Sequence, residues 1–144
     1  MGYFLKLFLS IWAGSLWWMI IVAKVLFDKI PTAFLAGVVA GQLFHYLSYF
    51  SIGMSVLIFF HLFKYHGWST IKSSQFWLIL FIAVIVLVNF FGIQPTLEAL
   101  KINAQPKEVM ESIFADRFAM WHGISSISFL IQTILVTALM LRWR

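Results

Sequence analysis

The sequence FWLILFIAVIVLVNFFGIQ, residues 76–94, is apolar along almost its whole length and contains no ionisable side chain. A helix needs about 20 predominantly apolar residues to cross a hydrocarbon core about 30 Å thick. Further stretches of this kind lie at residues 5–27, 41–63 and 118–141. The sequence therefore predicts an all-α integral membrane protein, a four-helix bundle that forms a single domain over residues 1–144.

The overall composition is that of a membrane protein. Of the 144 residues, 62% are hydrophobic and 10% are charged, and the mean hydropathy is +0.96, which excludes an ordinary soluble domain. Cysteine is absent, so disulfides, thiolate metal sites and cysteine nucleophiles are excluded as well. The net charge of +5 comes from basic residues that flank the spans, where headgroups and topology explain them. Nucleic acid is therefore not an expected partner.

Prolines mark the predicted helix boundaries. Pro31 separates the first helix from a second, which begins near Thr32 and is longer than a span requires. Pro95 is expected to end the third span. Residues 106–117 alternate carboxylates and apolar side chains at helical spacing, which predicts an amphipathic helix at the membrane interface before the fourth span.

The charges predict an orientation in the membrane. An even number of spans places both termini on one side, and that side carries basic residues without carboxylates, whereas the other carries all five carboxylates. Lys and Arg in short flanks favour the cytoplasm. We therefore expect a multi-pass protein of a bacterial inner membrane with both termini in the cytoplasm.

Nearly every strongly polar residue inside the spans lies toward the end of its span that is remote from the termini. Because consecutive spans alternate direction, these residues fall on one side of the membrane. Polar groups turned toward lipid would cost several kcal/mol, so they should face the interior and form a polar pocket. The residues concerned are Lys24, Asp28, His45, Asn89, Gln94, Arg117 and His122.

Two of these polar groups have alternative partners. Lys24 and Asp28 are one helical turn apart and either pair with each other or leave Lys24 to extend to the headgroups. Arg117 contacts a lipid phosphate, or else a carboxylate such as Glu98 or Asp28.

Small residues predict close helix packing beside the two histidines. Gly37 and Gly41 form a small-xxx-small pair, which lets two helix backbones approach and turns His45 toward a neighbouring helix. Gly123 lies beside His122 on the fourth helix, in a polar stripe of similar spacing. The sequence thus predicts packing contacts at Gly37, Gly41 and Gly123.

Several short motifs resemble one family of membrane proteins. They are AGSLW at residues 13–17, VLF at 25–27, Ala36 and Gly37 with Gly41 and Phe44, the proline after the third span, and Arg117, Phe118, His122, Gly123 and Ser125. In these the chain resembles the four-helix proteins similar to transmembrane protein 205, a domain of unknown function. The resemblance implies fold and membrane location, and hardly any chemistry. Lys24 and Ser128 depart from the family pattern, and His45 does not belong to it.

Two functions are compatible with these patterns. The first is a non-enzymatic accessory or scaffolding subunit that binds another membrane protein, a second copy of the chain or the lipid bilayer. The alternative is a haem- or metal-binding protein in which His45 and His122 ligate haem b, copper or zinc, with Asp28 as a further metal ligand. An enzyme or a transporter is not expected, since the sequence assembles neither an acid–base pair nor a pair of broken helices.

Overall fold

The computed structural model describes residues 2–105, 107 and 109–143. These residues form helices and no β-strand, and they include four helices long and apolar enough to cross a membrane. The predicted all-α fold with four spans is therefore confirmed. The α-helices are α1 (Gly2–Lys29), α2 (Ala33–His66), α3 (Ser74–Val88), α4 (Gln94–Ala104) and α5 (Ala115–Arg142).

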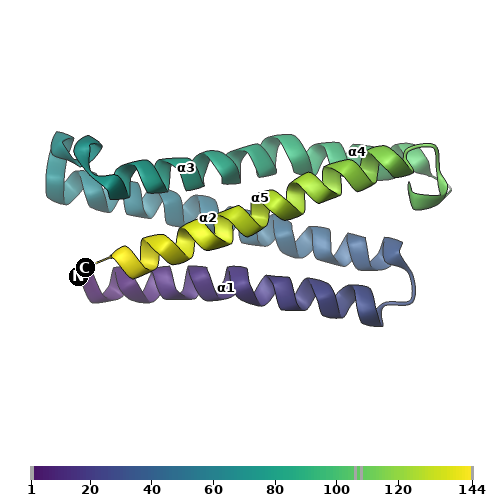
Figure 1. Ribbon diagram of the computed structural model, residues 1–144, viewed down its shortest axis with the longest axis horizontal. Coiled ribbons are helices and arrows are strands. Elements are labelled where there is room, and N and C mark those ends of the chain that lie inside the picture. Colours follow the sequence, from purple (N-terminus) through teal and green to yellow (C-terminus); the bar gives the residue numbers. More distant parts are fainter. Residues whose placement is uncertain (1, 106, 108, 144) are drawn as a thin grey trace.

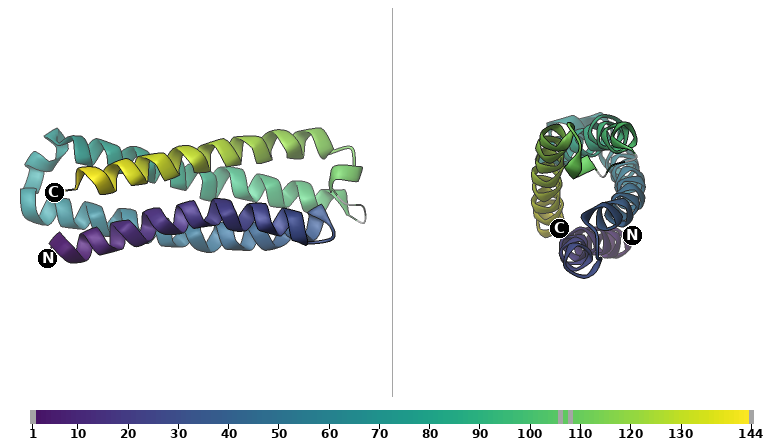
Figure 2. Two further views of the ribbon diagram at one scale, coloured as in Figure 1. Left: turned by 60° about the horizontal axis from the view of Figure 1, so that its bottom comes forward. Right: turned by 90° about the vertical axis from the view of Figure 1, so that its right-hand side faces the viewer.

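The helices form an elongated bundle with two different ends (Figures 1 and 2). The terminal end carries both chain termini and the 3₁₀ helix Gly67–Lys72, whereas the far end carries the loops after α1 and α4. The last helix, α5, runs obliquely: it lies beside α1 at the terminal end and beside α4 at the far end (Figure 1). This oblique course decides where the bundle is filled and where it is open.

The core of the bundle lies toward the terminal end. Its largest fully buried side chain is Trp12, which belongs to a cluster with Leu9 and Leu16 of α1, Ile58 of α2 and Leu139 of α5. Lipid tails are as apolar as these side chains, so close van der Waals packing holds the helices together here and not the exclusion of water.

Side chains at the loops define where the helices begin and end. The hydroxyl of Thr32 accepts a hydrogen bond from the Leu35 N–H at 3.2 Å and caps the start of α2. Ser73 caps α3 in the same way through the Phe76 N–H, also at 3.2 Å. Gly67 ends α2 with a φ of 53°, a conformation that glycine adopts without a steric cost.

Pro95 does not end the third helix, contrary to the prediction. The chain passes from α3 through one π-helical segment, Asn89–Ile93, directly into α4. The Gln94 N–H donates to the carbonyl of Asn89, five residues back. Proline lacks an N–H and its ring collides with the carbonyl four residues earlier in a regular α-helix, and the wider π turn relieves that conflict. The helix therefore continues to Ala104, beyond the predicted boundary.

The predicted amphipathic helix before the fourth span is absent from the described residues of that connection. They form a 3₁₀ turn, Val109–Glu111, followed by turns that lead into α5 at Ala115. The Ser112 hydroxyl donates to the Val109 carbonyl at 2.7 Å and accepts from the Phe114 N–H at 3.1 Å. Such local side-chain bonds compete with a helix. Pro106 and Glu108, which the prediction included, lie outside the described residues.

Candidate ligand-binding site

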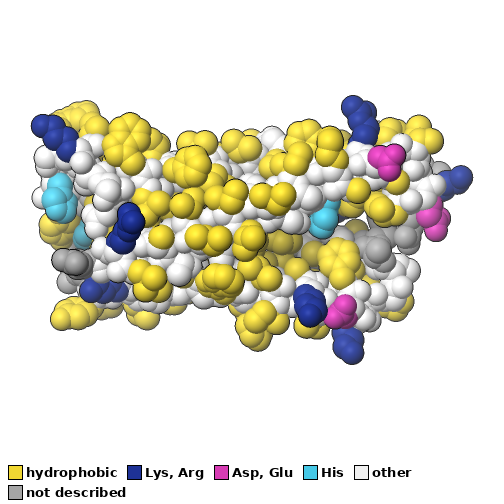
Figure 3. All heavy atoms as spheres, viewed as in Figure 1, with side chains coloured by type: hydrophobic (Ala, Val, Ile, Leu, Met, Phe, Trp, Pro, Cys, Tyr) yellow, Lys and Arg dark blue, Asp and Glu magenta, His cyan; other side chains and the backbone are white. Residues whose placement is uncertain are grey.

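A cavity of about 380 Å³ lies at the far end of the bundle. Its walls come from the end of α1, the start of α2, from α4, from the turn Val109–Glu111 and from the first turns of α5. The space-filling view shows the molecule hollowed here, between α1 and the pair α4 and α5 (Figure 3). Pockets for small molecules have volumes of about 300–1,000 Å³, so the cavity has the size of a binding site.

The cavity exists because α5 leaves α1 before α1 ends. At the terminal end the two helices are in contact, and the Trp17 indole N–H donates to the Thr137 hydroxyl at 3.0 Å. At the far end the contact between them is looser, with the ring centroids of Phe27 and His122 6.3 Å apart. The bundle is therefore open between α1 and α5, on the face seen in Figure 3.

Small residues keep this space open. Gly37 and Gly123 line the cavity, and a Cβ atom added to either would meet no side chain or neighbouring helix within 4 Å. At Gly41 a Cβ would only touch the tips of Glu98 and Lys101, both at 3.5 Å. These glycines do not make the close helix contact expected from the sequence. Their missing side chains instead contribute to the volume of the cavity.

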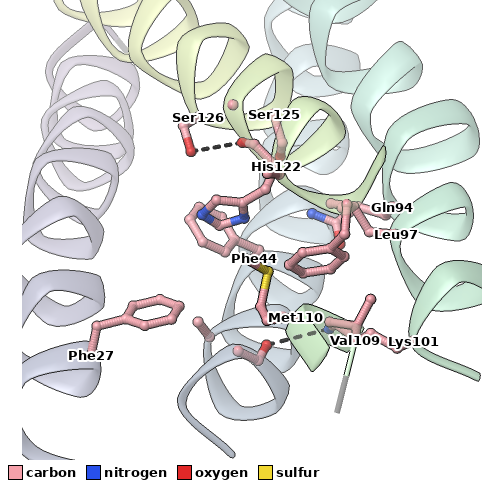
Figure 4. A pocket seen from close by; sticks show the side chains of 16 residues that line it. Phe27, Phe44, Gln94, Leu97, Lys101, Val109, Met110, His122, Ser125 and Ser126 are labelled. Carbon is pink, nitrogen blue, oxygen red and sulfur yellow. Dashed lines mark hydrogen bonds between the residues drawn. The ribbon is translucent and has the colours of Figure 1, made fainter. Parts of the chain in front are cut away.

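Most of the cavity wall is apolar. Aromatic and aliphatic side chains reach it from different helices, among them Phe27 of α1, Phe44 of α2, Leu97 of α4 and Phe118 of α5. The close-up shows Phe27 extending toward the cavity from one side and Met110 standing below the imidazole of His122 (Figure 4). A wall of this kind suits a hydrocarbon chain or an apolar ring.

His122 projects from α5 into the cavity (Figure 4). Its imidazole stacks on the ring of Phe118, one turn earlier, with centroids 6.0 Å apart and an interplanar angle of 12°. His122 is exposed, because the cavity whose wall it forms is open to the outside. The imidazole is thus held in place by aromatic rings and accessible to a ligand.

Lys101 joins α4 to α2 at the far end of the cavity. Its ammonium lies 2.9 Å from the Glu98 carboxylate and 3.5 Å from the main-chain carbonyl of Gly37. The Lys101 side chain is only 11% exposed, whereas that of Glu98 is 54% exposed. The cation is therefore buried in the cavity wall, and the more exposed Glu98 side chain reaches it beside Gly41. The sequence prediction missed this pair because it ended the helix at Pro95. Glu98 and Lys101, which are three residues apart, were therefore not recognised as neighbours on one face of a helix.

Gln94 and Asn89 occupy the inner part of this end of the bundle. Gln94, the residue after the π-helical segment, lines the cavity. Asn89 lies deeper, where its amide donates to the Ile85 carbonyl at 3.1 Å and to the Ser128 hydroxyl at 2.5 Å. Asn89 therefore joins the π-helical segment to α5 through a side-chain hydrogen bond.

The other predicted pocket residues lie elsewhere. Lys24, Asp28 and Arg117 are exposed, and the one salt bridge within the described part of the chain joins Lys101 to Glu98. The alternatives in which Lys24 pairs with Asp28, or Arg117 with either of the two carboxylates, are therefore not realised among these residues.

The structure does not bring the two predicted histidine ligands together. His45 does not line the cavity, and its ring contacts those of Tyr49 and Phe90, with centroids 5.1 and 4.9 Å away. Among residues 2–105, 107 and 109–143, no group of three His, Cys, Asp or Glu side chains is placed to hold a metal ion. Of the predicted ligands His45, His122 and Asp28, His122 alone lines the cavity.

A comparison with known proteins identifies the family of the chain. Curated proteins and solved structures give no match. One family model, described as a domain of unknown function (DUF4149), matches residues 7–106. That range runs from α1 through α4, so it includes the cavity walls formed by α1, α2 and α4. Since the match covers more than half of the sequence, the chain belongs to the DUF4149 family, and it is a small membrane protein with four apolar helices.

Proposed function

We propose that this protein is a non-enzymatic membrane protein that binds one amphiphilic molecule of the bilayer, a lipid or a lipid-like compound, in the far-end cavity. The observation that carries the proposal is the cavity itself, with a volume of about 380 Å³ and a mostly apolar wall. Apolar cavities with a few polar groups are the usual form of small-molecule sites. Here the polar groups are the side chains of Gln94, Lys101, His122, Ser125 and Ser126.

The size of the cavity favours a slender ligand. A water molecule occupies about 30 Å³ of liquid, and a methylene group is of similar size, so the cavity holds roughly a dozen such groups. That is enough for one ring system, or for most of one hydrocarbon chain whose end extends through the opening into the bilayer, and too little for a lipid with two long chains. A second chain would have to remain in the surrounding bilayer.

The opening between α1 and α5 supports uptake from the membrane. In a bundle whose four spans cross the bilayer, this side faces lipid, and Phe27, an apolar side chain at the opening, is both part of the cavity wall and exposed. A membrane molecule would enter sideways, without passing through water. At the far end, Lys101 links α4 to α2 and narrows a direct route from the aqueous side.

The finer predictions from the sequence remain predictions. Among the described residues, no contact favours an accessory role beside another membrane protein, or self-association, over lipid binding. Haem or metal binding would now have to rely on His122 without His45. Kinship with the proteins similar to transmembrane protein 205 likewise stays a prediction beside the match to the domain of unknown function.

Native mass spectrometry of the protein extracted in a neutral detergent tests the proposal. Gly123→Leu places a side chain in the cavity, whereas Gly53→Leu makes the same change at an exposed position of α2 that has no neighbour within 4 Å. We expect wild type and Gly53→Leu to retain a co-purified amphiphile or to bind added hexadecanol, and Gly123→Leu to lose this adduct. Equal retention by all three proteins would contradict the proposal.

A further inference from the structure

Lys101 is an unusual residue for an apolar cavity. Lysine is almost never buried without a partner, yet this side chain is 11% exposed at the far end of a membrane bundle. Its ammonium carries three N–H donors. One of them is used by Glu98 at 2.9 Å, and a longer contact of 3.5 Å runs to the Gly37 carbonyl. One N–H of the ammonium therefore has no partner among the described residues.

The charge on the cavity wall is positive, and its ion-pair partner Glu98 is not one of the residues that line the wall. Among the described residues that line it, Lys101 is charged and none is a carboxylate. Glu98, which pairs with Lys101, does not line the cavity, and its side chain is 54% exposed. Interactions between charges are stronger in a medium of low dielectric constant, and hydrogen bonds to charged groups are about twice as strong as neutral ones. An anionic group in the cavity would gain from both effects.

The charge also lies at the end where a lipid headgroup would be. Lys101 is close to the last residue of α4, and the contact at Gly37 is close to the first residues of α2. The apolar wall continues inward from there, with Leu97 one turn before Lys101 and Phe44 two turns after Gly37. A lipid of the leaflet at this end has its headgroup at the surface and its chain toward the bilayer centre. The cavity has the same order, with the charge of Lys101 at the end of the bundle and the apolar wall toward the bilayer centre.

We infer that the ligand is a single-chain amphiphile with an oxyanion headgroup, a carboxylate or a phosphate, which Lys101 binds while the chain occupies the apolar wall. The inference rests on the proposed function and adds the chemical class of the ligand. Glu98 competes with the headgroup for the same ammonium. Removing the competitor should therefore strengthen binding, and removing the ammonium should weaken it.

Titrations followed by native mass spectrometry in a neutral detergent test this inference. The probes are palmitate, lysophosphatidate and hexadecanol, of which the last has a chain but no charge. We expect Lys101→Gln to weaken palmitate binding about tenfold, the effect of losing one charge-assisted hydrogen bond. Glu98→Gln should strengthen palmitate binding. Lys29→Gln, a matched change at the exposed end of α1, should leave palmitate binding unchanged. Hexadecanol carries no charge, so its binding should be unaffected by Glu98→Gln and Lys29→Gln, and Lys101→Gln should weaken it much less than it weakens palmitate binding.

The outcomes separate the headgroup inference from the proposed function. Palmitate or lysophosphatidate binding that follows this pattern supports an oxyanion, and the better of the two probes identifies carboxylate or phosphate. If hexadecanol binds as well as the anions, and Lys101→Gln has no effect, the inference is overturned while the cavity remains a lipid site. If no probe binds the wild-type protein, the inference and the proposed function both fall. Because Lys101→Gln keeps hexadecanol binding as its internal control, a misfolded variant would be recognised.

Discussion

Ser51 on α2 accepts a hydrogen bond from the indole N–H of Trp12 on α1, at 2.9 Å, in the buried interior of the bundle. The same hydroxyl oxygen accepts a second bond from the side-chain amide of Gln132 on α5, at 3.1 Å. One small side chain therefore joins three helices in the interior. This polar contact and the apolar core hold the helices together on the side of the cavity that is nearer the chain termini.

Ser51→Ala should destabilise the protein more than a matched serine change one turn away. It leaves the buried donors of Trp12 and Gln132 without their acceptor, which we expect to cost about 1–3 kcal/mol. Ser55→Ala removes a hydroxyl that donates to the Ser51 carbonyl within the same helix, and should cost less. Equilibrium unfolding in mixed micelles measures both. If both substitutions lowered the stability equally, the contact that joins three helices would contribute no more than the hydrogen bond of Ser55 within one helix.

The two histidines should differ in their effect on the cavity. His122→Ala removes a side chain from the cavity wall and should change ligand binding several-fold, because a cavity residue contacts the ligand directly. His45→Ala should leave binding unchanged, since His45 packs against Tyr49 and Phe90. Binding of hexadecanol to each variant measures the difference.

A visible spectrum with elemental analysis tests the predicted haem or metal site in the same proteins. The structure does not bring His45, His122 and Asp28 together, so we expect no bound species that depends on both histidines. A Soret band, or near-stoichiometric copper or zinc, that disappears in both His45→Ala and His122→Ala would overturn this expectation.

The predicted orientation can be measured by cysteine labelling, since the chain has no cysteine of its own. Ser69 lies in the connection at the terminal end and Gln105 follows α4 at the far end, and both are exposed. With cytoplasmic termini, an impermeant maleimide should label Gln105→Cys in intact cells and reach Ser69→Cys only after permeabilisation. The reverse pattern would place the cavity at the cytoplasmic side.

The sequence predicts the helices well because their signal is local. Long apolar stretches identify the four spans, and the polar residues at one end indicate where a site lies. Pro95 misled the prediction, since its usual effect is to end a helix and a π turn instead accommodates it. The error removed α4 from the bundle, and with it the pairing of Glu98 and Lys101.

The cavity could not be predicted because it depends on how whole helices cross. The glycines at positions 37, 41 and 123 favour close packing when helices meet, but the oblique course of α5 leaves Gly37 and Gly123 facing open space. The sequence also left open whether His45 and His122 share a site, for a related reason. Both lie toward the far end of the bundle, yet they face different neighbours, and the direction of a face is fixed by packing.

Photochemical crosslinking tests the central claim, that the cavity holds a membrane amphiphile, most directly. A single-chain amphiphile with a diazirine in its chain is incorporated with the protein into bilayers, irradiated, and the modified residues are mapped by mass spectrometry. We predict crosslinks concentrated on the cavity wall, at residues such as Phe27, Leu97 and Phe118, and abolished by Gly123→Leu but not by Gly53→Leu. Crosslinks spread evenly over exposed positions such as Val56 and Phe81, and unchanged in Gly123→Leu, would show that the amphiphile only coats the bundle and that the cavity is not its site.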